Sequence, residues 1–384
     1  MNSPGTGPLS GLRVVEFEAI GPGPFAGMML ADMGADVLLL DRPGDSDLGI
    51  GRERRFDALL RGRRSLVVDL KTPAGVAAAL SVCDKADALI EGFRPGVMER
   101  LGLGPDVVLA RNPRLVYGRM TGWGQSGPLA ERAGHDIDYI AVAGVLHAIG
   151  RAGEAPLPPL NLVGDFGGGG MLLAFGIACG VIEARTSGRG QVVDAAMIDG
   201  AALLATMFSG FMASGSWGDA RGTNILDSGA PWYDTYETRD GRHVAVGAIE
   251  AKFYAELLAR LGLDASLAAS QHDRRTWPAL RATLAARFHE KTRDEWAAVF
   301  ADADACVAPV LTFAESRAHP QVVARAGAIE LGGFAQPAPA PRFARTPGAA
   351  TRPPPERGSG GAEALAEWGF NAAEIARVIP PRSR

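Results

Sequence analysis

Short aliphatic runs alternate with longer helix-like stretches along the first third of the chain. Each run has the length and the residue types of a buried strand. The expected strands are 12–17, 37–40, 66–70, 88–90 and 115–117. The expected helices are 25–33, 73–85 and 106–111, the second with Thr72 as N-cap and Pro73 as its first residue. Alternating strands and helices form βαβ units, so we expect a doubly wound α/β layer with a parallel sheet.

The middle of the chain keeps a helical pattern. Residues 134–149 place apolar side chains at a helical period, which predicts one helix. Residues 171–184 are apolar all round, which indicates a helix buried on every side.

After residue 200 the pattern changes to that of a smaller α+β domain. Residues 217–232 contain turn-forming residues without a period, and 233–249 alternate as a hairpin with its turn at Asp240-Gly241. Three helices are expected next, at 251–261, 277–288 and 293–300. The Pro- and Arg-rich stretch 336–358 is expected to cross the surface, and 362–378 to close the chain as one amphipathic helix.

Composition excludes several classes of protein. Hydrophobic residues make up 47% of the 384 residues and charged residues 21%, which is typical of a folded globular chain. The net charge of −4 disfavours a general nucleic-acid binder. The apolar stretch Met171–Ile182 is shorter than the ~20 residues of a membrane span, and the N-terminus has no secretory signal. We therefore expect a cytoplasmic protein without nucleic acid or a membrane as partner.

Cysteine and histidine do not form a metal-binding pattern. The cysteines, at 83, 179 and 306, are scattered and include no CxxC pair. The histidines outside position 135 show no i,i+3 or i,i+4 spacing. We expect neither a disulfide framework nor a metal site.

The segment Gly21–Ala26 fits the G-x-G-x-x-G/A dinucleotide fingerprint, with Asp41 at a suitable distance. That fingerprint works by offering backbone N–H groups to a pyrophosphate. Pro22 and Pro24 have no N–H to offer. The expected role is therefore a tight turn that lets helix and strand pack closely.

Residues 42–71 carry seven Arg and one Lys against five acidic residues. The core of this basic segment is Arg52, Arg54, Arg55, Arg61, Arg63 and Arg64, and the next turn adds Arg94 and Arg100. Arg binds phosphate through a planar, bidentate fork. Two interpretations stay open: a solvated charged face, or a ligand with several phosphates at the ends of successive strands.

Three acid/base candidates stand at expected helix starts. His135, in Gly134-His135-Asp136, would be kept neutral by a helix N-terminus and could act as a base, although a capping turn with Asp136 is the alternative. Asp165 precedes four glycines, which an N-cap alone does not require, so a ligand or another backbone is expected to approach closely. Glu250 ends an expected strand and opens a helix, where an acid that complements the helix N-terminus is the alternative.

Several motifs together resemble the family III CoA-transferases (the CaiB/BaiF family) from about residue 7 to residue 379, and within it the α-methylacyl-CoA racemase branch. The motifs are GLRVVEF at 11–17, LADMGADV at 30–37, VVDLK at 67–71, EGFRPGVMERLGLGP at 91–105, TGWGQSGP at 121–128, GHDIDYIAVAG at 134–144, PPLNLVGDFGGGG at 158–170, GRGQVVDAAMIDG at 188–200 and GAPWYDTYETRDG at 229–241.

The resemblance implies a fold and a binding set. The fold is α/β: an interlocked homodimer in which each chain has a Rossmann-like large domain made of both termini and a smaller inserted α+β domain. The expected parts are 1–200 for the N-terminal part of the large domain, 201–232 for a linker, 233–325 for the small domain, and 326–384 for a return linker and the C-terminal part of the large domain. The implied CoA-binding residues are Arg42, Val68, Asp69, Leu70, Lys71, Gly92, Phe93, Arg94, Arg100, Gly134, Ile137, Asp138 and Tyr139. The chain departs from the family pattern at Asp138 and in the length of 45–56, which leaves the roles of Arg52, Arg54 and Arg55 open.

Chemistry separates the two activities of the family. A CoA-transferase needs one carboxylate nucleophile, at Asp165, whereas a racemase needs two acid/base groups on opposite faces of the α-carbon. His135 and Asp165 supply such a pair, and Glu250 can orient His135. We therefore expect a racemase that epimerises 2-methylacyl-CoA through an enolate held by the Asp136 N–H, with a CoA-transferase as the alternative and a non-catalytic CoA-binding protein as a third hypothesis. CoA is part of the substrate, and no metal or redox cofactor is expected.

Overall fold

The computed structural model describes residues 7–44 and 49–379, and the chain divides into two compact units. The first unit combines Met1–Ala143, Leu160–Ala205 and Val323–Arg384. The second combines Gly144–Pro159 with Thr206–Val322. The first unit is therefore assembled from both ends of the chain.

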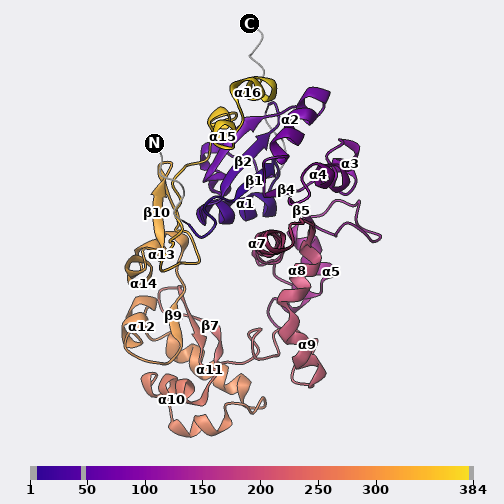
Figure 1. Ribbon diagram of the computed structural model, residues 1–384. Helices are drawn as coiled ribbons and strands as arrows, with labels where there is room; N and C mark the ends of the chain where they lie inside the picture. Colours follow the sequence, from indigo (N-terminus) through magenta and orange to yellow (C-terminus); the bar gives the residue numbers. More distant parts are fainter. Residues whose placement is uncertain (1–6, 45–48, 380–384) are drawn as a thin grey trace. The chain divides into compact units, whose positions relative to one another are not determined.

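A parallel six-stranded sheet forms the centre of the first unit (Figure 1). Its strands are β1 (Arg13–Phe17), β2 (Asp36–Asp41), β3 (Arg63–Val67), β4 (Ala88–Glu91), β5 (Val116–Thr121) and β6 (Val192–Ala196). They lie in the order β3-β2-β1-β4-β5-β6, so the winding reverses between β1 and β4. The expected α/β layer is confirmed, but β3 begins three residues before the predicted 66–70, and β6 was not predicted.

Helices cover both faces of the sheet. The core on one face contains α2 (Pro73–Cys83), α3 (Val97–Arg100), α4 (Pro105–Arg111), α15 (Gly361–Glu367) and α16 (Ala372–Val378). The core on the other face contains α1 (Pro22–Asp32) and α7 (Met171–Ser187). Thr72 caps α2 as expected, because its hydroxyl accepts the Gly75 N–H at 3.0 Å. The expected single closing helix 362–378 is two helices, interrupted where Gly369 has a φ of 86°.

The C-terminal segment covers the outer edge of β3. Ser65 N–H donates to the Ser359 carbonyl at 2.8 Å, and Gly358 N–H donates to the Ser65 hydroxyl at 2.7 Å. These bonds satisfy some of the backbone and side-chain hydrogen-bonding groups of β3, an edge strand that would otherwise be open to solvent. A short hairpin of β10 (Ala328–Leu331) and β11 (Phe334–Pro337) precedes this segment, and two 3-10 turns, η1 (Arg54–Phe56) and η2 (Ala58–Leu60), precede β3.

The glycine run after Asp165 lies in a π-helix, η3 (Leu162–Gly170), that continues directly into α7. A Cβ on Gly200, in α8 (Met197–Leu204), would lie 1.8 Å from the Gly168 carbonyl oxygen, and one on Gly170 would lie 2.6 Å from the Pro22 oxygen. The glycines therefore admit α8 and α1 at backbone contact, which confirms the expected close approach of another backbone.

The structure corrects three expectations about helices in this region. The predicted helix 134–149 is two helices, α5 (Asp136–Val142) and α6 (Val145–Ala148), separated by Gly144 with a φ of 83°. Helix α7 is not buried on every side, because Met171, Phe175 and Ile182 are 50%, 67% and 66% exposed.

The third correction concerns length. The continuous helix Leu162–Ser187 has 26 residues and is long and apolar enough to cross a membrane by length and composition, with 44% of its most apolar window buried. Its buried residues pack against the sheet and α1, as those of a core helix do.

The second unit contains a small antiparallel sheet and several helices. Its residues 144–159 and 206–232 lie outside the 233–325 that the sequence predicted for the small domain. Strands β7 (Tyr233–Glu237), β8 (His243–Gly247) and β9 (Val307–Pro309) form an antiparallel sheet, with the predicted hairpin turn at Asp240-Gly241. The predicted helices are confirmed as α10 (Ala251–Arg260), α11 (Trp277–Phe288) and α12 (Arg293–Val299). Their core is built on the buried aromatic residues Trp232, Trp296 and Phe288. The remaining elements are α9 (Thr206–Ala213), η4 (Ala265–Ser270), α13 (Phe313–Ala318) and α14 (Pro320–Ala324).

Candidate active site

Candidate binding residues follow the carboxyl ends of four neighbouring strands. Glu18 comes after β1, Arg42 after β2, Val68–Lys71 after β3 and Gly92–Arg94 after β4. Doubly wound sheets bind ligands outside these ends, at the point where the winding reverses. The strand order therefore brings the binding segments that the sequence predicted together at the carboxyl ends of the strands.

Asp165 faces the loop that follows β1. A Cβ on Gly21, which has a φ of 64°, would lie 3.2 Å from Asp165 Oδ2. Asn161 Nδ2 donates to the same oxygen at 3.0 Å. The predicted tight turn at Gly21 thus makes room for a carboxylate. Sequence reasoning did not single out Asn161, although it lies within a quoted motif four residues before Asp165.

A buried carboxylate links the His135 and Asp165 segments. His135 is the N-cap of α5, and Asp136 is the first residue of that helix. Asp136 is buried, and its Oδ2 accepts the Asp165 backbone N–H at 2.7 Å. The interpretation of Asp136 as the cap is wrong, because the acid that accepts the His135 N–H, at 2.9 Å, is Asp138. Asp136 is therefore free to join α5 to η3.

Electrostatics at this site favour proton transfer. Burial is the main cause that raises the pKa of Asp165, and the Asp136 carboxylate raises it further. The Asn161 hydrogen bond and the nearby His135 act in the opposite direction. A carboxylate with a raised pKa is a stronger base and can also hold a proton at higher pH.

Tyr139 fixes the loop that leads into His135. Its hydroxyl donates to the Gly134 carbonyl, and its ring packs edge-on against Trp123 at 4.8 Å. A Cβ on Gly134 would lie 2.7 Å from this ring, so the loop has no space for a side chain there. Burial raises the Tyr139 pKa to about 12, so the phenol stays neutral. Ile137, beside His135, is exposed.

The implied CoA-binding residues differ in how accessible they are. Val68 is buried, and Asp69 accepts the Lys71 N–H at 3.0 Å, which shapes the turn after β3. Arg42 Nε lies 3.2 Å from Glu18 Oε2, so its charge is partly compensated. Among the implied CoA-binding residues, the cations Lys71, Arg94 and Arg100 are exposed and form no ion pair with the described part of the chain.

Most of the basic segment instead forms ion pairs inside the first unit. Three of its arginines are buried and pair with acids on β1, β2 and α1. These pairs are Arg61 with Asp32, Arg63 with Glu16, and Arg64 with Asp36. Arg54 pairs with buried Asp41 at 2.7 Å. Neither proposed interpretation fits Arg61, Arg63 and Arg64, because their side chains are at most 7% exposed and are occupied by these ion pairs. Arg52 and Arg55 pair with Asp57 and Glu53 close to the surface.

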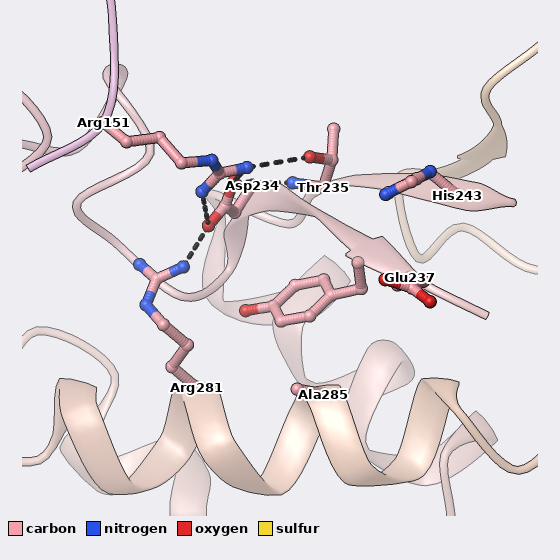
Figure 2. A pocket seen from close by; sticks show the side chains of 8 residues that line it. Arg151, Asp234, Thr235, Glu237, His243, Arg281 and Ala285 are labelled. Atoms are coloured by element: carbon pink, nitrogen blue, oxygen red, sulfur yellow. Dashed lines mark hydrogen bonds and ion pairs between the residues drawn. The ribbon is translucent and has the colours of Figure 1, made fainter. Parts of the chain in front are cut away.

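Glu250 belongs to the second unit, where it is exposed at the N-cap position of α10. The same unit contains a cavity of about 290 Å³ beside β7 (Figure 2). Arg151 and Arg281 converge there on the buried carboxylate of Asp234, at 2.9 Å in the case of Arg151. Glu237 also lines the cavity, so two acids balance the two arginines and the cavity offers no surplus charge to an anionic ligand. No group of three His, Cys, Asp or Glu side chains is placed to hold a metal within residues 7–44 and 49–379.

Residues 9–360 match the sequence profile of CoA-transferase family III. The chain belongs to this family. Among its relatives in family III, an alpha-methylacyl-CoA racemase of Mus musculus is 46% identical over 376 residues, 97% of each chain. One of Homo sapiens is 44% identical over 371 residues, covering 96% of this chain and 95% of the relative. The crystal structure of a CAIB/BAIF family protein from Brucella suis superposes with a TM-score of 0.79 at 28% identity, over 94% of this chain and 99% of that one.

Proposed function

We propose that the chain is a racemase that inverts the α-carbon of 2-methylacyl-CoA thioesters. The observation that carries this proposal is the bond from the Asp165 N–H to Asp136 Oδ2 at 2.7 Å. It holds a general acid/base on η3 next to the α5 N-terminus, where His135 supplies a second one. The high identity to two named racemases supports this activity over acyl transfer.

The reaction follows from the two groups. The thioester acidifies the α-proton, and His135 or Asp165 removes it, depending on which epimer is bound. The backbone N–H of Asp136 holds the enolate oxygen. The other group then returns a proton to the opposite face.

CoA binds at the carboxyl ends of the parallel strands. Arg42, Lys71, Arg94 and Arg100 meet the phosphates, and the backbone of 68–71 and 92–94 lies at the same ends. Arg suits this role because its guanidinium forms bidentate bonds with phosphate. CoA enters as part of the substrate, and the reaction moves only a proton, so the proposed chemistry uses no metal or redox cofactor.

The working form is a homodimer. Met171, Phe175 and Ile182 share one exposed face of α7. A contiguous apolar face of this kind marks an interaction surface. A second copy of the chain, interlocked with the first, covers this apolar face of α7 in the proposed dimer. The partners are thus acyl-CoA and the chain itself, in the cytoplasm, without nucleic acid or membrane.

Proton exchange in D2O tests the activity. Incubation with a single epimer of a 2-methylacyl-CoA, followed by NMR, should show deuterium at the α-carbon without any acceptor acid. Asp165→Asn and His135→Ala should each abolish net epimerisation, and each should lose exchange mainly with one epimer, by roughly 10²–10⁴-fold.

The transferase alternative predicts a different result. If Asp165 is a nucleophile, it forms an acyl anhydride that hydroxylamine traps during turnover. Finding that adduct, together with no exchange in the absence of an acceptor acid, would overturn the racemase proposal.

A further inference from the structure

Arg119 on β5 spans two carboxylates that belong to different elements. Its Nε lies 2.9 Å from Glu91 Oε1, at the end of β4, and its Nη1 lies 2.8 Å from Glu99 Oε1, in α3. The side chain of Glu91 is 0% exposed and that of Arg119 is 8% exposed, whereas Glu99 is 44% exposed. The proposed mechanism uses none of these residues.

The segment between the two carboxylates is a tight turn. Glu91 Oε2 accepts the Phe93 N–H at 2.7 Å, and the Phe93 ring packs edge-on against Phe17 at 6.4 Å. The Arg94 carbonyl accepts the Val97 N–H at 3.1 Å, with Gly96 at a φ of 80°. A Pro-Gly pair with positive φ at its second position is typical of a type II turn.

Two of the three arginines proposed to bind phosphate lie in or against this turn. Arg94 is its first residue, and Arg100 Nη1 lies 3.1 Å from the Cβ position of Gly96, so that side chain folds back over the turn. Because Glu91 begins the segment and Glu99 follows it, one guanidinium ties both ends to β5.

We propose that Glu91, Arg119 and Glu99 form a clamp that positions Arg94 and Arg100 for the phosphates of acyl-CoA. The clamp rests on the proposed function, since it acts on the substrate of that reaction. Its members are positioning residues and do not touch the reacting atoms. Loss of the clamp therefore weakens substrate binding in ground and transition states alike, which raises KM and leaves kcat unchanged.

The clamp also gives acyl-CoA binding a pH dependence. The groups that face Glu91 are Arg119 and Tyr117 from β5 and Glu99 from α3. Burial raises the Glu91 pKa to about 7, against the lowering effects of the Phe93 N–H and Arg119. Below that pH the protonated Glu91 loses its charged bond to Arg119, so the clamp loosens and KM rises as the pH falls from 8 to 6.

Glu91→Gln tests the clamp, because the amide keeps an acceptor for the Phe93 N–H but has no charge. At pH 8 its KM for the acyl-CoA should be about tenfold above that of the unchanged protein, with kcat unchanged. Its KM should not vary between pH 6 and 8. The control is Asp106→Asn, at an exposed acid in the first turn of α4, which should behave like the unchanged protein.

Two further measurements separate the outcomes. The same acyl group on pantetheine lacks the nucleotide phosphates, so Glu91→Gln should leave its KM unchanged. If the Gln variant does not fold, Glu99→Gln, at the exposed end of the clamp, should show the same shift in weaker form. Equal KM values for variants and unchanged protein, or a loss confined to kcat, would overturn the clamp. Failure of the proposed function is distinct, because the unchanged protein would then show no α-proton exchange.

Discussion

Replacing Arg63 by methionine tests whether the basic segment stabilises the fold or binds the ligand. The side chains of Arg63 and Glu16 are both 0% exposed, and Arg63 Nε lies 2.9 Å from Glu16 Oε2. The guanidinium also donates to the backbone carbonyls of Pro24, Leu59 and Arg61. Arg63 thus joins β1, β3 and α1 from inside the first unit.

The expected loss is large because the substitution leaves a buried acid without its partner. Breaking a buried ion pair costs about 3–5 kcal/mol. Burial is already the main cause that raises the Glu16 pKa, so the carboxyl would take up a proton once the guanidinium is gone. The double variant Glu16→Leu/Arg63→Met should recover most of the loss, since an apolar pair of similar size can replace a buried ion pair.

Urea unfolding followed by far-UV circular dichroism measures these differences. Arg63→Met should unfold at a clearly lower urea concentration, and the double variant should lie close to the unchanged protein. Arg94→Met is the control: Arg94 is exposed, so stability should stay within about 0.5 kcal/mol while acyl-CoA affinity falls. If Arg63→Met instead kept full stability and lost acyl-CoA affinity, the structural interpretation of the basic segment would be wrong.

Three other substitutions probe the packing, the acid/base site and the second unit. Gly200→Ala places a methyl group 1.8 Å from the Gly168 carbonyl oxygen and should destabilise the protein by about 1–3 kcal/mol or more in urea unfolding. Gly210→Ala is the control, because a Cβ there has nothing within 4 Å, and it should be neutral or slightly stabilising. Equal effects of the two substitutions would contradict the backbone contact between Gly200 and Gly168. Asp136→Asn removes a charge that raises the Asp165 pKa, so the acid limb of the exchange profile for one epimer should move to lower pH, and an unmoved limb would argue against the coupling. Asp234→Asn leaves the two arginines in Figure 2 without their carboxylate and should speed limited proteolysis of residues 144–159, with unchanged digestion as the refuting result.

Local sequence pattern determined most of the secondary structure. The strands from β1 to β5 were predicted within a few residues, because aliphatic runs of strand length are bounded by turn residues. Thr72 marked a helix start and Asp240-Gly241 a hairpin turn, since both signals act through bonds to backbone only a few residues away. Gly144 and Gly369 were missed as breaks because apolar periodicity continues across them, and the positive φ at each is a backbone property.

Only the tertiary structure decided which charges meet. Sequence identifies Arg63 as one of a run of cations, but its partner Glu16 lies 47 residues away on a strand two places across the sheet. Asp136 meets the Asp165 N–H across 29 residues for the same reason. Such pairs depend on strand order and on glycines that let helices approach, and no local periodicity encodes either. Burial then determines how these groups ionise, because it sets the cost of keeping each charge away from water.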